Sequence, residues 1–190
     1  SYTNEIADAI KKANSNGEVS GDKIYTVAVD ALGYGYIGMN SHNISVNKEP
    51  GSDASKNLRR GFATIFAAYR DLAVSTYYGD RASVINYPIS NTSWAAPQPT
   101  DDGYEIAFSK DVNGNPIYTS GMSDEDKYAA AKKAALGFFE AAGYKVENGK
   151  IVSAPEGAKM EYTVMVPGGG TGDHPSFMIM TEAQKALADI

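Results

Sequence analysis

The sequence predicts an α+β fold: a single domain over residues 1–190, in which a small mixed β-sheet is covered by three main helices. Two observations support this class. Several segments repeat apolar residues at the period of a helix with one buried face, and short runs rich in β-branched and aromatic residues lie between turn-forming residues. These helices and hairpins occupy separate stretches rather than a regular βαβ alternation, and no linker divides the chain.

Four helices are predicted from apolar periodicity and from residues suited to helix ends. They cover residues 4–13, 53–75, 123–142 and 176–190. Ser123 is a good N-cap for the third of them, and Gly143 is a good residue to end it. Because aromatic side chains dominate the apolar faces, we expect four of them to be largely buried in the core: Phe62, Phe66, Phe138 and Phe139.

The β-structure is predicted from composition and turn chemistry. Asn-Gly pairs at 113–114 and 148–149 favour the tight turns that join antiparallel strands. The predicted strands and hairpins cover residues 23–31, 34–40, 104–118, 146–152 and 159–166. Between the helices and these strands, residues 77–103 form a long loop that contains the single Trp. We expect this loop to be ordered, because loops of that length are functional or disordered and this one is rich in aromatic residues.

The charge balance excludes several functions. A net charge of −6 argues against nucleic acid as a partner, since phosphates need a basic surface. The lack of cysteine excludes disulfides, thiolate metal sites and cysteine nucleophiles. The chain has no long apolar run that could span a membrane, and its first 17 residues carry no signal-peptide pattern. Arg59 and Arg60 are interpreted as solvated or ion-paired rather than as an anion site.

Two glycine-rich segments imitate phosphate-binding loops. Residues 33–38 (GYGYIG) match GxGxxG, but a dinucleotide site needs a helix to start there, and the sequence that follows predicts none. Residues 168–172 lack the Lys of a P-loop, and Asp173 after them would repel phosphate. We interpret the first as glycines of an aromatic strand pair. The second is interpreted as a turn before a helix, with Asp173 or His174 near the cap and Pro175 in the first turn.

No motif predicts catalysis, a metal or a cofactor. Residues 111–115 imitate half of a calcium loop, but Pro116 occupies the position that requires Gly. His42 and His174 show no ligand spacing, and no Ser lies in a GxSxG elbow. The acidic pair at 101–102 is interpreted as a solvated feature of the loop. The sequence therefore predicts ligand capture rather than chemistry.

Five features in a fixed order carry a family resemblance. They are an aromatic segment ending in Asn, an Arg-Arg helix, a Gly- and Pro-bearing loop, a helix closing in Ala-Gly-Tyr, and a strand, loop and helix. In this chain they lie at residues 36–40, 58–61, 79–94, 140–144 and 160–190. In this order they resemble the extracellular solute-binding proteins that serve peptide- and nickel-type ABC importers.

The resemblance implies a two-lobed receptor that closes on its solute by a hinge, of which this chain would be most of the second lobe, with a periplasmic-binding-protein type II fold. The expected solutes are peptides, and the expected partners are the permease subunits of the importer. The expected location is the periplasm or the cell surface, where the receptor would be anchored by a lipid. A fragment of this kind is expected to fold but to bind peptides weakly or not at all. The expected ligand-binding residues are Tyr87, Trp94, Asn40 and His174.

Two rival functions stay open on the sequence: an enzyme that uses the glycine loops for a nucleotide, and a structural interaction domain with exposed tyrosines. A rival role also stays open for Trp94, which could hold the long loop to its own domain by packing.

Overall fold

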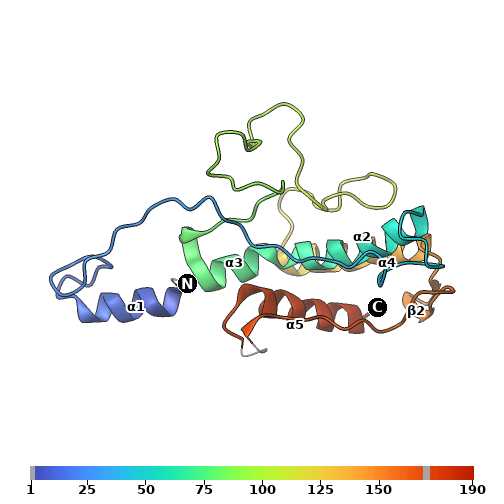
Figure 1. Ribbon diagram of the computed structural model, residues 1–190. Helices are drawn as coiled ribbons and strands as arrows, with labels where there is room; N and C mark the ends of the chain where they lie inside the picture. Colours follow the sequence, from blue (N-terminus) through green and yellow to red (C-terminus); the bar gives the residue numbers. More distant parts are fainter. Residues whose placement is uncertain (1–2, 169–171) are drawn as a thin grey trace. The chain divides into compact units, whose positions relative to one another are not determined.

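A computed structural model describes residues 3–168 and 172–190, and its regular structure is mostly helical (Figure 1). The helices are α1 (Asn4–Ala13), α2 (Asp53–Ala68), α3 (Arg70–Tyr78), the short 3-10 helix η1 (Gly79–Arg81), α4 (Asp124–Ala141) and α5 (Pro175–Ala188). Contacts divide the chain into two compact units, each described by itself. Unit 1 comprises Ser1–Gly35 and Asp71–Tyr104, and unit 2 comprises Tyr36–Arg70 and Glu105–Ile190.

The core of unit 2 lies where α2 packs against α4 and α5 (Figure 1). Leu58 and Ile65 of α2 are fully buried, and so is Phe139 of α4. The Phe139 ring meets Phe62 edge-on, with 5.2 Å between ring centroids. Of the four phenylalanines expected in the core, Phe138 and Phe139 are buried, which confirms the prediction, whereas Phe62 and Phe66 are half-buried.

Side chains of α2 form hydrogen bonds with the polar loop that precedes this helix, residues 44–50. Buried Ser55 accepts the Val46 N–H at 2.8 Å. The Arg59 guanidinium donates to the carbonyl oxygens of Ile44 and Pro50 at 3.0 and 2.7 Å. These bonds satisfy one amide group and two carbonyl groups of the loop that would otherwise lose their partners against the helix. Arg59 is thus bound to backbone oxygens, and the prediction of a solvated or ion-paired residue is wrong for it.

The long helix predicted over residues 53–75 is interrupted. α2 ends at Ala68, Tyr69 leaves helical geometry at φ −103° and ψ 4°, and α3 then begins. The Tyr69 N–H bonds the Phe66 carbonyl three residues back, as in a tightened last turn. Its ring is buried and stacks on Tyr128 of α4, with 4.6 Å between centroids. Packing of this one side chain accompanies the break, which apolar periodicity does not encode.

The ends of α4 and α5 follow the predicted chemistry. Ser123 caps α4 and forms a reciprocal capping box with Asp126. His174 caps α5, its Nδ1 accepting the Ser176 N–H at 3.1 Å, and Pro175 occupies the first turn. Part of the predicted glycine turn before α5, residues 169–171, lies outside the described residues. Among the described residues, no helix is both long and apolar enough to cross a bilayer.

The β-structure differs from the prediction. One hairpin is confirmed: β1 (Lys145–Glu147) pairs antiparallel with β2 (Lys150–Ser153). Its turn residues Asn148 and Gly149 both have positive φ, 53° and 74°, as a tight hairpin turn requires. The hairpin predicted over residues 104–118 is reduced to a single bridge between Lys110 and Pro116.

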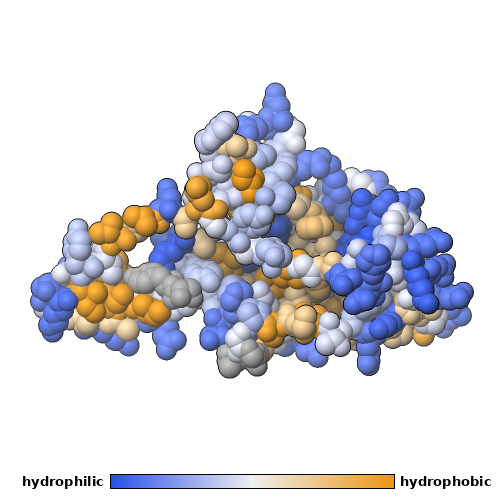
Figure 2. Space-filling view, in the orientation of Figure 1, coloured by the Kyte–Doolittle hydropathy of each residue, from blue (hydrophilic) through white to orange (hydrophobic). Residues whose placement is uncertain are grey.

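The predicted strands at 23–31, 34–40 and 159–166 are not strands, and the described residues contain no mixed sheet. These segments are extended in character but pair with no other strand. Without a neighbouring strand, most of their β-forming side chains stay in solvent: Val29 is 83% exposed and Met165 is 95% exposed. Tyr162 is an exception, because it is half-buried and meets Phe62 of the core at 5.2 Å between ring centroids. Figure 2 shows hydrophobic surface along the segment that follows α1 in the chain.

Unit 1 is ordered mainly by polar side chains. Asn14 is buried, and its side-chain NH₂ group donates hydrogen bonds to the carbonyl oxygens of Glu18 and Ile24. Its side-chain oxygen accepts hydrogen bonds from the backbone N–H groups of Lys23 and Ile24. Asn4 of α1 donates to the Thr76 carbonyl at 2.8 Å and so satisfies the C-terminal end of α3. These amides hold the turn after α1 and the end of α3, from which the long loop departs.

Two tyrosines of unit 2 give opposite predictions for the loss of a hydroxyl. Burial raises the pKa of Tyr144, whose hydroxyl donates to the Lys159 carbonyl at 2.6 Å. The buried hydroxyl of Tyr118 has no hydrogen-bond partner among the described residues. At neutral pH we expect Tyr144→Phe to lower the free energy of unfolding by about 1 kcal/mol, and Tyr118→Phe to leave it unchanged or raise it. Urea unfolding of both variants measures this, and equal losses would contradict it.

The raised pKa of Tyr144 also predicts alkaline instability. Because the folded-state pKa lies above the unfolded value of 10.0, the unfolded chain loses its proton first as the pH rises. The stabilisation is therefore complete below about pH 10 and is lost above it. A pH titration of stability should show a shallower alkaline fall in Tyr144→Phe than in the unmodified protein.

Candidate functional site

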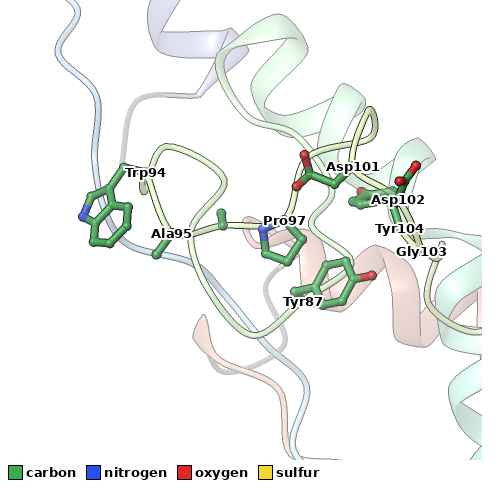
Figure 3. Close-up of a pocket in the computed structure, with 9 residues that line it drawn as sticks. Tyr87, Trp94, Ala95, Pro97, Asp101, Asp102, Gly103 and Tyr104 are labelled. Atoms are coloured by element: carbon green, nitrogen blue, oxygen red, sulfur yellow. The ribbon is translucent and has the colours of Figure 1, made fainter.

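A solvent-open pocket of about 410 Å³ lies in the long loop of unit 1 (Figure 3). Aromatic, proline and acidic side chains line it, among them Tyr87, Trp94, Pro97, Asp101, Asp102 and Tyr104. All of them come from one stretch of 18 residues, so the pocket is built by the path of the loop itself. It therefore belongs entirely to unit 1.

Successive hydrogen-bonded turns fix the path of this loop. The Ser90 and Thr92 hydroxyls donate to the Ala31 carbonyl at 3.3 and 3.1 Å, which ties the loop to the segment after α1. The Ala96 N–H bonds the Ser93 carbonyl at 3.1 Å, and Ala96 and Ser90 are both buried. A long loop with its backbone groups paired in this way has a defined conformation.

The aromatic wall is formed by Tyr87 and Tyr104. Their rings lie 5.5 Å apart between centroids at a tilt of 54°, and both residues are half-buried. The Asn86 amide donates to the Tyr104 hydroxyl at 2.9 Å and holds that ring in place. The two rings thus present apolar faces, and the polar tip of Tyr104 is fixed, a composition common in ligand sites.

Trp94 lies at the rim of the pocket. Its indole projects away from Tyr87 and Tyr104 in Figure 3, and the residue is 97% exposed. A Trp so exposed makes almost no packing contact, so it does not pin the loop to its own unit, as one reading of the sequence proposed. Leaving so large an apolar surface in water is typical of an interaction site.

Two carboxylates also line the pocket, at the end away from Trp94 in Figure 3. Asp101 accepts the Gln98 N–H through one oxygen at 2.7 Å and so shapes the turn that carries it. Asp102 makes no hydrogen bond or ion pair with any residue in the described ranges, and its side chain is exposed. One carboxylate is therefore partly structural, and the other is available to a ligand.

The other two expected ligand residues belong to unit 2 and do not line this pocket. The Asn40 side chain accepts the His42 and Asn43 amides at 3.0 and 3.2 Å and forms a turn. His174 caps α5 through Nδ1, as described above. The structure brings Tyr87 and Trp94 together and shows local structural roles for Asn40 and His174.

Other chemistry finds little support in the described residues. Residues 33–38 lie in an extended segment, and no helix begins directly after Gly38. The backbone amides of a helix N-terminus, which a dinucleotide phosphate needs, are therefore not next to these glycines. No group of three or more acidic or histidine side chains within residues 3–168 and 172–190 could hold a metal. No protein-family profile, curated protein or solved structure matches the chain.

Sequence reasoning missed Tyr104 and the two carboxylates. The sequence predicts Tyr104 to start a hairpin and the acidic pair to be a solvated feature. A signal was present: residues 97–104 (PQPTDDGY) combine two prolines, two acids and an aromatic residue at the end of an aromatic loop. The turn that bonds Gln98 to Asp101 helps to bring these residues into one pocket with Tyr87.

Proposed function

We propose that this chain is part of a solute-binding receptor of an ABC importer and captures peptides outside the cytoplasm. The observation that carries the proposal is the pocket formed by Tyr87, Tyr104 and the rim residue Trp94. Its lining residues come from residues 87–104, which overlap residues 79–94, the loop that the family resemblance assigns to the ligand cleft. That the fold is the second lobe of a type II binding protein, and that permease subunits are its partners, belong to the same proposal.

The physical character of the pocket suits a peptide. A peptide backbone supplies its own donors and acceptors, so a receptor gains most from apolar faces and a few polar groups that orient the solute. Tyr87 and Tyr104 offer such faces, and their fixed rings lose little conformational freedom on binding. The open shape fits a site that encloses only one side of its solute.

One observation favours a second candidate, a domain that binds other proteins. Tyr25 is 80% exposed and Tyr36 is 82% exposed, and both lie in extended segments without a strand partner. The nucleotide-using enzyme is disfavoured, because no helix begins directly after residues 33–38, Asp173 follows the second glycine segment, and the acidic pocket would repel phosphate.

The single Trp provides a direct test. In a nuclear magnetic resonance spectrum it gives one indole N–H signal. We expect millimolar short peptides to shift that signal and the amide signals of residues 87–104 in a saturable way, and nucleotides to leave them unchanged. A shift by nucleotides, or no shift by any peptide, would overturn the proposal.

Removing the indole should separate binding from folding. Because Trp94 packs against almost nothing, Trp94→Ala should change the free energy of unfolding by less than about 0.5 kcal/mol. Peptide affinity, followed by the amide signals of residues 87–104, should fall roughly two- to tenfold, the contribution of one aromatic contact. Tyr25→Ala removes another exposed aromatic of unit 1 outside the pocket and should leave the affinity unchanged. Equal losses of peptide affinity in the two variants would show that the assignment of Trp94 to the binding site is wrong.

A further inference from the structure

We propose that the pocket selects its solute by positive charge: it takes a peptide through an ammonium or guanidinium group held between the tyrosine faces and the Asp101–Asp102 edge. The inference rests on the proposed function and narrows it to cationic peptides. The shared chemistry is a cation, which a peptide can offer through a Lys or Arg side chain or through its amino terminus.

The arrangement of the carboxylates is the first support. Asp102 lines the pocket, is exposed and engages no other described residue, so its charge is available to a solute that binds there. Asp101 keeps one oxygen beyond the bond from Gln98. None of the described residues that line the pocket is basic, so none neutralises the pair. A cation arriving there gains ion pairing that a neutral or anionic solute does not.

The aromatic wall supports the same ligand. The face of an aromatic ring carries negative potential and attracts a cation within about 6 Å of the ring centre. Tyr87 and Tyr104 line the same pocket as the carboxylates, and Tyr104 lies beside Asp102 in Figure 3. Rings and carboxylates lining one volume favour a cation with an apolar stem, since the stem can lie on the rings while the charge reaches the acids.

The distribution of charge along the chain is an independent support. Residues 1–35 and 71–104, which form unit 1, hold nine acidic and four basic residues. Unit 1 therefore carries −5 of the total charge of −6, although it is the smaller of the two units. A field of one sign around an open pocket concentrates solutes of the opposite sign. The acidity is thus concentrated in the unit that carries the pocket.

The test compares the affinities of four tripeptide amides at constant ionic strength. Each peptide is titrated into the protein, and its binding is followed by the signals of the Trp94 indole and of the loop amides. Acetyl-Ala-Lys-Ala-amide carries only a side-chain cation, Ala-Ala-Ala-amide only an amino terminus, acetyl-Ala-Ala-Ala-amide no charge, and acetyl-Ala-Glu-Ala-amide a negative charge. We expect at least one cationic peptide to bind about three- to fivefold more tightly than the neutral one, the effect of an exposed ion pair. The acidic peptide should bind least.

Two variants locate the effect. Asp102→Asn should abolish the preference for the cation, and it leaves the turn bond of Asp101 in place. Asp8→Asn removes the same charge from α1, in the same unit but outside the pocket, and should preserve the preference. If Asp8→Asn weakens the preference as much as Asp102→Asn, the effect is one of net charge and the inference is wrong.

The outcomes separate this inference from the proposed function. If all four peptides bind equally, peptide capture stands and charge selection falls. If no peptide binds but tetramethylammonium shifts the loop signals, a cation site stands and peptide capture falls. If neither peptides nor tetramethylammonium shift any signal, both are overturned. The two cationic peptides show which source of charge the pocket takes.

Discussion

Phe139→Ala is expected to lower the free energy of unfolding by about 3–5 kcal/mol, the usual cost of removing a buried phenyl ring. The ring is 2% exposed and sits where α2 and α4 pack together. It meets Phe62 edge-on at 5.2 Å and Tyr144 at 5.7 Å between centroids. Alanine would leave a cavity bordered by these rings, whose own positions depend on Phe139, so little collapse can fill it.

Phe66→Ala is the matched control, because Phe66 is a half-buried ring on α2 at the edge of the same cluster. Its loss should cost at least about 1 kcal/mol less than that of Phe139, since less apolar area returns to water. Urea unfolding followed by circular dichroism measures both variants. Equal effects, or an unchanged midpoint in Phe139→Ala, would mean that α2 and α4 do not pack as described.

The helices could be predicted from the sequence because their signals are local. The α1 prediction matches the structure, and the caps at Ser123 and His174 follow from side chains next to the helix ends. The break at Tyr69 could not be predicted, because it depends on a ring from another helix. Arg59 was misjudged for the same reason: its partners are carbonyls of a loop 9 and 15 residues away in the sequence.

Most of the strand predictions are wrong, for a different reason. β-Propensity records how well a side chain fits a pleated and half-buried surface, and such a surface requires a neighbouring strand. Residues 145–153 contain their own partner across an Asn-Gly turn, and there the prediction is correct. Residues 23–31 have strand composition but no partner among the described residues, so Tyr25 and Val29 lie in solvent. Composition alone does not reveal whether a partner exists.

The candidate site was half predicted. Tyr87 and Trp94 follow from the aromatic composition of a long loop, and they do line one pocket. Asp101 and Asp102 could not be placed, because two adjacent acids in a loop are most often solvated. Their place in one pocket with Tyr87 depends on a turn that the sequence does not specify. The charge preference proposed above therefore required the geometry.

Gly61→Ala is expected to destabilise the protein by about 1–3 kcal/mol, although alanine is the better helix former. Gly61 lies inside α2, and a Cβ there would come within 2.8 Å of Cε1 and 3.0 Å of Cζ of Phe139. Real Cβ atoms do not approach so closely, and the ring cannot move aside because Phe62 and Tyr144 hold it. The glycine is therefore what allows α2 and α4 to approach at this point.

Gly137→Ala supplies the control with the opposite sign. Gly137 is also inside a helix, α4, but a Cβ there would meet only Cγ1 of Val112 at 3.6 Å, an ordinary contact. Alanine should therefore raise the free energy of unfolding by about 0.5–1 kcal/mol. In a Phe139→Leu background, where the obstructing ring edge is gone, Gly61→Ala should lose most of its cost. If Gly61→Ala stabilises the protein as Gly137→Ala does, or keeps its full cost beside Leu, the close contact between Gly61 and Phe139 is not the cause.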